Sequence, residues 1–224
     1  MAEAVLFDFG GTLDADGLPW CARFYAGYRA GGGSLAMVTF EQYFAVADRL
    51  LAQRPDVSGF GFRRMVEVQV ETLSGLLPDG RALDSGAWAA RFLGEARATV
   101  TRNRPVLDEL AARYELGVIS NFTGNLRPCL EELGVADHFV VVFDSAVVGI
   151  RKPDARLFRA AFDALGRAPE ECWMVGDNPF ADIQPATQLG CSTCWLAPAA
   201  RTLPAGVAPT RRISALGELP AALV

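Results

Sequence analysis

Lysine and histidine are almost missing from this chain of 224 residues. Lys152 is the sole lysine, so arginine supplies the rest of the 21 basic side chains, and His138 is the sole histidine. A serine or cysteine hydrolase with a histidine base would have to route its proton transfer through His138. That residue lies in the segment VADHFVVVF, where we expect a packing or helix-end role. The composition therefore disfavours a histidine-based hydrolase.

A basic stripe and a long apolar run are also lacking. The net charge is −5 and the two signs are mixed along the chain, so no cluster of cations is available to neutralise a run of phosphates, and we expect no nucleic-acid partner. No apolar run approaches the roughly 18 residues of a membrane span, and no basic segment leads into a cleavable apolar stretch. We therefore expect a cytoplasmic protein with no membrane partner.

The five cysteines do not suggest a disulfide framework, because their number is odd and their spacing scattered. Cys191 and Cys194 form a CxxC, but they lie in GCSTCWL, which is typical of a buried strand. No second cysteine or histidine pair completes a zinc site. We interpret them as buried thiols.

Short apolar runs alternate with helical patterns. The runs at 5–9, 116–120, 140–143, 172–175 and 193–196 are typical of buried parallel strands. Helices are predicted over 103–115, with Pro105 in the first turn, over 125–134, and over 152–166, opening at Pro153. A last strand and a closing helix are expected near the C-terminus. This alternation predicts an α/β fold with a doubly wound parallel sheet.

The gap between the first two strands predicts an inserted helical domain. The first strand and its loop end near Asp16, yet the next strand begins at Leu116, too far for one crossover. We expect an α/β core from 1–15 and 97–224 and a helical domain over 16–96. In the latter, Thr39 with Gln42 is a candidate capping box and Ser85 a candidate cap.

Polar residues follow four of the predicted strands at their carboxyl ends, where ligands bind in open parallel sheets. In the segment FDFGGTLD, two glycines after the first strand permit a tight turn with exposed backbone N–H groups. The candidate site residues are Asp8, Gly10, Gly11, Ser120, Asn121, Lys152, Asp177 and Asp182.

These residue types suit phosphoryl transfer through an aspartyl-phosphate, with Asp8 as the nucleophile. Carboxylates facing a dianionic substrate would repel it, so a hard cation such as Mg²⁺ is required; Asp8, Asp177 and a carbonyl near Gly10 offer it oxygen ligands. Lys152, Ser120 and the turn amides would hold the phosphoryl oxygens. The sole lysine of an arginine-rich chain suggests a constrained site, since a guanidinium fork does not replace a compact ammonium.

At these residues the sequence resembles the haloacid dehalogenase-like (HAD) hydrolase superfamily. The segments FDFGGTLD, VISN, GIRKPD and VGDNPFADIQPATQLG are similar to its four motifs, in order. The similarity covers roughly 1–15 and 97–200, and the insert stands where members carry a helical cap. It implies Asp8 as nucleophile, Ser120 and Lys152 as phosphate binders, Asp177 as metal ligand and Asp182 as a second acidic group of the metal site.

One position departs from that pattern. Phosphatases of the superfamily usually carry a second aspartate two residues after the nucleophile, as the acid that protonates the leaving alcohol, and here the residue is Gly10. A positioned acid-base group contributes about 10²–10⁴-fold in rate. A phosphatase for small phosphorylated substrates with good leaving groups is the favoured interpretation, and Asp14, Asp16 or a cap residue is a candidate replacement for the acid.

Two other functions stay open. Metal-independent dehalogenases of the superfamily also lack the second aspartate, but they replace the metal ligand of the fourth motif, which is present here. A catalytically silent relative would bind a phosphorylated ligand or a protein partner.

In the insert, Phe24 and Tyr28 share a helix face. Any of these two residues, Trp20 or Tyr25 would form an aromatic lid over the substrate if it were turned toward the crevice.

Overall fold

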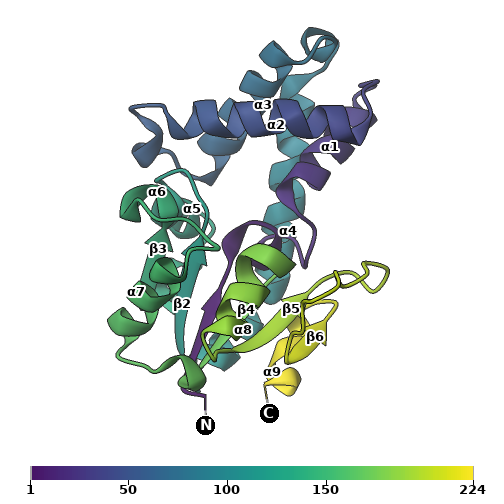
Figure 1. The fold of residues 1–224 in the computed structure, drawn as a ribbon. Helices are drawn as coiled ribbons and strands as arrows, with labels where there is room; N and C mark the ends of the chain where they lie inside the picture. The colour runs from purple at the N-terminus through teal and green to yellow at the C-terminus, as the bar shows by residue number, and fades with distance from the viewer. Residues whose placement is uncertain (1, 224) are drawn as a thin grey trace.

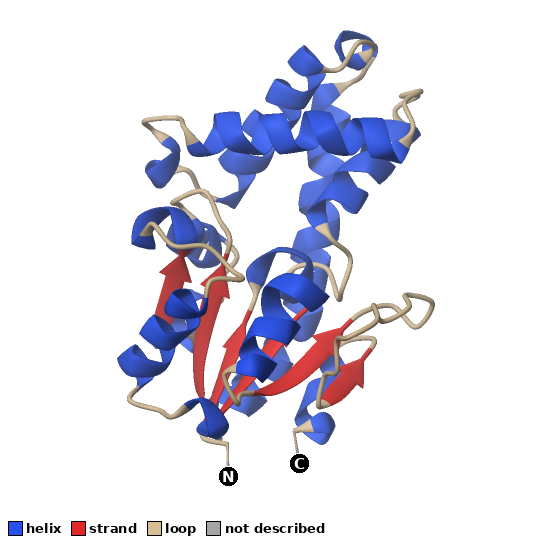
Figure 2. Ribbon diagram, in the orientation of Figure 1, coloured by secondary structure: helices blue, strands red, loops and turns tan. Residues whose placement is uncertain are grey.

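Within residues 2–223, which the computed structural model describes, six parallel strands form one sheet (Figures 1 and 2). The strands are β1 (Ala4–Phe7), β2 (Glu115–Ser120), β3 (Val141–Asp144), β4 (Cys172–Gly176), β5 (Ser192–Leu196) and β6 (Arg211–Ile213). Their spatial order is β3-β2-β1-β4-β5-β6. Since all neighbours are parallel, the carboxyl ends of β1, β2 and β4 lie together at one edge.

Helices cover both faces of the sheet, which confirms the predicted doubly wound α/β fold. The C-terminal half of α4, α5 and α9 pack on one face against Val5, Phe7 and Val118, while α7 and α8 pack on the other against Leu6 and Met174. Because both faces are covered, the AVLF of β1 is buried throughout. These helices are α4 (Ser85–Ala111), α5 (Leu126–Glu132), α7 (Ala155–Leu165), α8 (Gln184–Gln188) and α9 (Leu219–Ala222), with one short turn, α6 (Ser145–Val148).

A helical region lies beyond the carboxyl ends of the strands, toward which the arrowheads point in Figure 2. It contains α1 (Trp20–Ala30), α2 (Met37–Ala52), α3 (Phe62–Leu76) and the first half of α4. Aromatic side chains fill its interior: Phe24 packs on Phe92 with ring centroids 4.3 Å apart, and the indole N–H of Trp88 donates to the Phe24 carbonyl at 3.0 Å. The inserted helical region is therefore confirmed.

Several predicted helix boundaries are wrong. Pro105 lies inside α4 rather than in a first turn; it and Thr101, whose carbonyl loses its helical partner, are both exposed, so water can solvate that carbonyl. The start of α2 precedes Thr39 by two residues, at Met37, with no side-chain cap. Asp84 rather than Ser85 caps α4.

The predicted helix start at Pro153 is also wrong. Asp154 caps α7, its carboxylate accepting from the Arg156 amide, so the helix begins at Ala155.

The predicted closing strand and helix are present as β6 and α9. Because α4 runs unbroken through residue 96, no loop separates the helical region from the core there, and the division into 1–15 plus 97–224 and 16–96 stays a prediction. None of the helices described between residues 2 and 223 has the length and apolar character needed to cross a membrane.

Candidate active site

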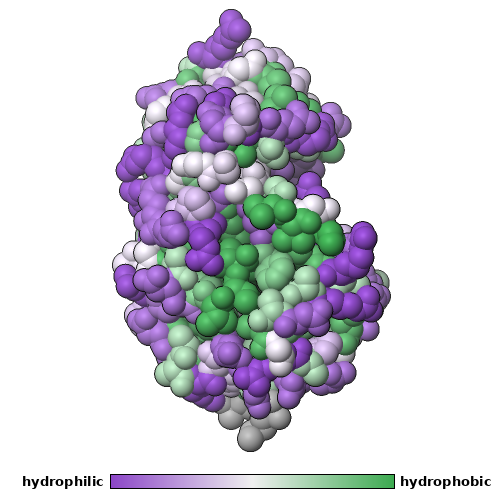
Figure 3. Space-filling model, turned by 90° about the vertical axis from the view of Figure 1, so that its left-hand side faces the viewer, coloured by the Kyte–Doolittle hydropathy of each residue, from purple (hydrophilic) through white to green (hydrophobic). Residues whose placement is uncertain are grey.

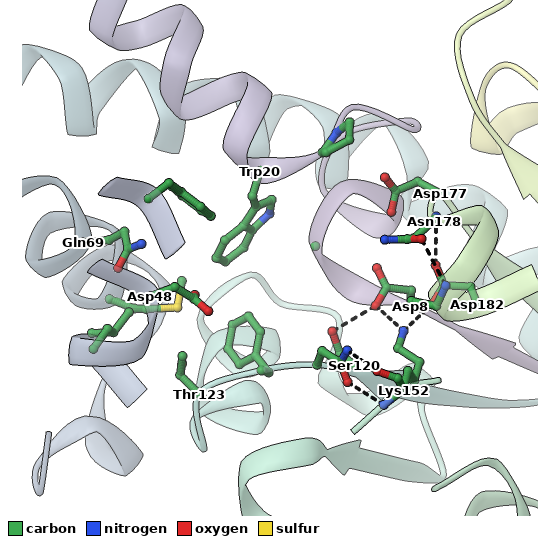
Figure 4. Close-up of a pocket in the computed structure, with 18 of the residues that line it drawn as sticks. Asp8, Trp20, Asp48, Gln69, Ser120, Thr123, Lys152, Asp177, Asn178 and Asp182 are labelled. Atoms are coloured by element: carbon green, nitrogen blue, oxygen red, sulfur yellow. Dashed lines mark hydrogen bonds and ion pairs between the residues drawn. The ribbon is translucent and has the colours of Figure 1, made fainter. Parts of the chain in front are cut away.

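Three strand ends and two loops bring their polar side chains to one cavity of about 240 Å³ (Figure 4). Asp8 follows β1, Ser120 ends β2 and Asp177 follows β4. Lys152 reaches in from the loop before α7, and Asp182 from the turn after Asp177. The structure thus brings together the reactive side chains that the sequence places at strand ends.

Asp8 is buried and its two carboxylate oxygens differ. Oδ1 accepts from Ser120 Oγ at 3.0 Å and from Lys152 Nζ at 2.7 Å. Oδ2 receives only a long contact of 3.4 Å from Thr12 Oγ1. The Asp8 amide donates to the Val175 carbonyl of β4, which fixes the backbone at the strand end. Oδ2 is therefore the oxygen with capacity left for a reacting atom or a cation.

Lys152 is held between two carboxylates. Its Nζ donates to Asp182 Oδ1 at 2.5 Å as well as to Asp8. Burial alone would lower the pKa of Lys152, but the charges of Asp182 and Asp8 outweigh it and raise the pKa above its ordinary value. Lys152 is a permanent cation at this site.

Asn121 fixes the backbone of Lys152. Its Oδ1 accepts from the Lys152 amide at 2.8 Å and its Nδ2 donates to the Lys152 carbonyl at 2.9 Å. The peptide bond between Lys152 and Pro153 is cis. Asn121 also lines the cavity, but its side-chain amide is already hydrogen-bonded to the backbone N–H and C=O of Lys152 and is not free to bind a substrate.

The turn after Asp8 depends on Gly11 and on Thr12, which sequence reasoning missed. Gly11 has φ +98° and a Cβ there would come within 2.9 Å of the Asp177 carboxylate. Gly11 N–H donates to Asp14 Oδ1 at 2.8 Å, so it is not free for a phosphate. Thr12 Oγ1 accepts from the Asp177 amide at 3.1 Å and so ties the first strand end to the fourth. In the sequence, the threonine of the segment GGTLD was the residue that could have indicated this contact.

Asp8, Asp177 and Asp182 form a buried acidic cluster with one oxygen of each within 4.8 Å of the others. Burial raises the pKa of Asp177 well above its usual range, and the charges of Asp8 and Asp182 raise it further. Burial likewise raises the pKa of Asp182, to about 6, against the opposing charge of Lys152. One buried ammonium does not balance three buried carboxylates.

The donor set fits a divalent cation with oxygen ligands such as Mg²⁺. Asp177 lines the cavity, and among residues 2–223 the only cation within 4.0 Å of its carboxylate is Arg201, whose Nη1 lies 3.6 Å from Oδ2. Asp182, predicted as a metal-site group, has both oxygens engaged, by Lys152 Nζ and by the Asn178 amide at 3.0 Å. Asp8 Oδ2 and Asp177 are therefore the carboxylates free to hold the ion, and Gly10 lines the same cavity.

Asp14 does not line the cavity. It is fully buried, and it accepts from Trp20 Nε1 at 2.8 Å and from Arg23 Nη1 at 2.6 Å in addition to Gly11. Burial raises its pKa and the adjacent Arg23 charge opposes the rise. Asp14 anchors the start of α1 to the turn after the nucleophile.

Asp16 is likewise occupied elsewhere. It accepts from Arg102 Nη2 at 2.5 Å and Asn103 Nδ2 at 2.9 Å, both on α4, and from the Leu216 amide. It is thus a joint between the linker, α4 and the C-terminal segment. The placement of Asp14 and Asp16 gives no support to the hypothesis that either transfers the proton.

The helical region supplies an apolar wall to the cavity. Trp20 lines it, with its ring 5.6 Å from that of Phe122, whereas Phe24 and Tyr28 are fully buried in the interior of the helical region. A Cβ on Gly10 would lie 3.1 Å from the Trp20 ring. The indole thus occupies the space into which a side chain at position 10 would extend.

The same wall carries two polar side chains, Asp48 of α2 and Gln69 of α3, which sequence reasoning missed. Figure 4 shows them across the cavity from Asp8. Neither is next to a glycine turn or a strand end. Both belong to amphipathic helices, where no local pattern distinguishes a cavity residue from a solvated one.

Comparison with known proteins shows which family the chain belongs to. The sequence matches the haloacid dehalogenase-like hydrolases over residues 2–190. The chain belongs to the haloacid dehalogenase-like hydrolase family. Within it, this HAD-like hydrolase is 37% identical to a phosphoserine phosphatase of Thermus thermophilus over 58% of the chain and 56% of that relative. It is 32% identical to a phosphoglycolate phosphatase of Rhodospirillum rubrum over 85% of the chain and 77% of the relative.

Solved structures share the fold. A 2-haloacid dehalogenase from Pseudomonas syringae superposes with a TM-score of 0.59 at 25% identity, over 100% of this chain and 98% of the other. The putative HAD-hydrolase YfnB of Bacillus subtilis, described as bound to magnesium, gives 0.61 at 21% identity, over 98% and 97%. The chain spans about half the length of the first two curated relatives it matches, so their activities are not transferred to it as findings.

Proposed function

We propose that this HAD-like hydrolase is a Mg²⁺-dependent phosphatase of a small phosphorylated metabolite, acting through an aspartyl-phosphate at Asp8. The observation that carries the proposal is that the two carboxylate oxygens of Asp8 have different partners. One oxygen is bound by Ser120 and Lys152, and the other is nearly free and faces the Asp177 side of an acidic cluster in need of a cation.

The residues fit the steps of phosphoryl transfer. A bound Mg²⁺ would offset the repulsion between the carboxylates and the phosphate dianion. Asp8 Oδ2 would attack phosphorus, while Ser120 Oγ and Lys152 Nζ would exchange their contacts with Oδ1 for contacts with phosphoryl oxygens. Asp182 and Asn121 act on Lys152, one on its ammonium and one on its backbone. Water then cleaves the aspartyl-phosphate and releases Asp8 and phosphate.

The leaving group departs without a carboxylic acid at position 10. Trp20 occupies that space, and its only N–H donor is bound to Asp14. The developing alkoxide therefore depends on its own stability or on a proton from water, and we expect the rate to fall steeply as the pKa of the leaving alcohol rises.

The printed names of the relatives support the substrate class, since the Thermus and Rhodospirillum enzymes are named for small phosphorylated acids. The dehalogenase fold neighbours supply an alternative reaction, attack of Asp8 on a carbon that bears halide. That reaction needs no cation, whereas this site concentrates three buried carboxylates around one lysine. The electrostatics therefore favour the phosphatase.

The test is a panel of phosphomonoesters and 2-haloacids, assayed with Mg²⁺ and with EDTA on the wild type and on Asp8→Asn. We expect phosphate release that requires Mg²⁺ and Asp8, and a phosphorylated Asp8 peptide after rapid acid quench. Halide release that persists in EDTA would replace the proposal with the dehalogenase. A well-folded protein that turns over neither class and forms no phospho-Asp8 would identify a silent relative.

A further inference from the structure

Gln69 is a buried side chain whose amide oxygen has no partner in the described part of the chain. It is only 2% exposed, it lies on the cavity wall formed by the helical region, and its Oε1 has no hydrogen-bond donor among residues 2–223. Leaving such a group unsatisfied costs about 1–3 kcal/mol. An apolar side chain would fill the place without that cost, so the amide indicates a ligand group that donates to it.

Asp48 lies on the same cavity wall as Gln69 and is also without a donor. Among the described residues, no hydrogen bond or ion pair within 4.0 Å engages its carboxylate. Burial raises its pKa, and the charges that oppose the rise, Arg151 and Arg49, belong to exposed side chains whose field is screened by water. A cation inside the cavity would meet a carboxylate with no competing partner.

The stretch between this pair and the Asp8 cluster is largely apolar. Figure 4 shows Trp20 between them, and Phe44, Leu51, Met65 and Phe122 complete this part of the lining. The cavity thus has polar side chains at each end, and the two ends favour ligand groups of opposite charge. Lys152 and the candidate cation site lie at the end proposed to receive the phosphate, and the Asp48 carboxylate and the Gln69 side-chain amide lie at the other. The view in Figure 3 shows hydrophobic side chains gathered in a hollow on one face of the molecule.

We propose that Asp48 and Gln69 form a subsite for an ammonium group at the far end of the leaving group, so that the preferred substrates are phosphomonoesters of amino alcohols. The ammonium donates to Gln69 Oε1 and to the Asp48 carboxylate, and the carbon chain contacts Trp20. A neutral hydroxyl would satisfy the amide but leave the carboxylate charge uncompensated. This inference rests on the proposed phosphatase function for the placement of the phosphate.

Binding measurements on Asp8→Asn, which cannot turn over substrate, test the subsite. The probes are ω-aminoalkyl phosphates of two to six carbons, with n-alkyl and ω-hydroxyalkyl phosphates of matched length, titrated by calorimetry with Mg²⁺ present. At the best length we expect the amine to bind at least about 10-fold more tightly than its alkyl match, as for a charge-assisted hydrogen bond. Asp48→Asn should remove most of that preference.

Two further variants separate binding from packing. Glu41→Gln removes the same charge from an exposed position of α2 outside the cavity and should keep the amine preference. Gln69→Met should reduce the preference and yet raise the melting temperature of the ligand-free protein, because it removes the unsatisfied amide. If Gln69 were only structural, its replacement would change stability and leave the preference intact.

The outcomes distinguish this inference from the function it rests on. Equal binding of amino and alkyl phosphates by a protein that hydrolyses both would overturn the subsite and keep the phosphatase. Equal preference for the amine and the hydroxyl would overturn the cation assignment. Amine-selective binding that depends on Asp48, in a protein that hydrolyses neither series, would retain the subsite and overturn the phosphatase.

Discussion

The two walls of the cavity satisfy their polar groups in opposite ways. On the core side Lys152 bridges Asp8 and Asp182, and Asn121 grips the backbone of Lys152. On the side of the helical region, Asp48 has no partner among the described residues and Gln69 leaves an acceptor buried and empty. The core wall lacks only a cation beside Asp8 and Asp177, whereas the other wall leaves a carboxylate and an amide oxygen without a donor among the described residues.

Under the proposed function, this difference separates a wall that carries out the reaction from a wall that selects the substrate. Phosphoryl transfer makes the same demands for every ester, so its groups can be pre-organised against one another before substrate arrives. Recognition of a particular leaving group requires free donors or acceptors, whose cost is offset only when that group binds. The free groups of this molecule are therefore the better guide to its substrate.

The largest expected effect follows from removing the Lys152 ammonium from the core wall. Lys152→Met leaves Asp8 and Asp182 as uncompensated buried charges, so we expect a loss of about 3–5 kcal/mol in the free energy of unfolding. We also expect a fall of about 10³-fold in kcat/KM, since the donor proposed to bind the phosphoryl group is lost. Urea denaturation and steady-state kinetics measure the two effects.

Lys152→Arg is the matched control, because it keeps the charge and changes only its shape. It should recover much of the stability and little of the activity, since the planar fork cannot take the place of Nζ between two carboxylates. An arginine variant with near wild-type activity would show that charge alone suffices at this position.

The same difference explains how far the sequence predicts the molecule. The strands, the insert and the candidate residues from Asp8 to Asp182 follow from short apolar runs, each with polar residues at its end, because parallel strands align their carboxyl ends. The roles of Asp14 and Asp16 did not follow, since proximity in sequence says nothing of the arginines on α1 and α4 that occupy them. Asp48 and Gln69 were missed because the packing of α2 and α3 decides which helix faces meet the cavity.

The next effect concerns the joint between the walls, where Asp14 accepts from Gly11, Trp20 and Arg23. Asp14→Asn leaves the buried Arg23 with Glu95, 4.0 Å from its Nε, as its nearest carboxylate, so we expect a loss of about 3–5 kcal/mol in the free energy of unfolding. Activity should fall by a similar factor for aryl and alkyl phosphates, because the residue positions Trp20 and does not protonate the leaving group. Loss of activity confined to alkyl phosphates, with stability unchanged, would instead identify Asp14 as the acid.

A smaller effect concerns the charge excess at the acidic cluster. Since burial and mutual repulsion raise the pKa of Asp177 and Asp182, the folded protein binds protons that the unfolded chain does not between about pH 6 and 3.8. The metal-free protein should therefore become more stable as the pH falls from 7.5 toward 6 and into that window, until general acid unfolding begins.

Mg²⁺ and Asp177→Asn should each remove that trend by different routes. Mg²⁺ neutralises the carboxylates at pH 7.5, and Asp177→Asn relieves the repulsion, so we expect each to raise the melting temperature by about 2–4 °C for each kcal/mol gained. Asp177→Asn should gain nothing further from Mg²⁺. Differential scanning calorimetry with EDTA or Mg²⁺ measures this, and an Mg²⁺ response that survives in Asp177→Asn would contradict the ion site.

The smallest expected effect is that of Gly10→Asp alone, which places the acid usual in the superfamily where the two walls meet. Gly10 has φ −75° and ψ 111°, a backbone that any residue adopts, so only the Trp20 ring, 3.1 Å from the Cβ position, opposes the new side chain. The single variant should therefore change the hydrolysis of alkyl phosphates less than about threefold, far below the 10²–10⁴-fold of a positioned acid. With Trp20→Ala added to make room, the aspartate should raise that rate above Trp20→Ala alone. A large gain from the single variant would show that Trp20 yields readily and does not define the leaving-group wall.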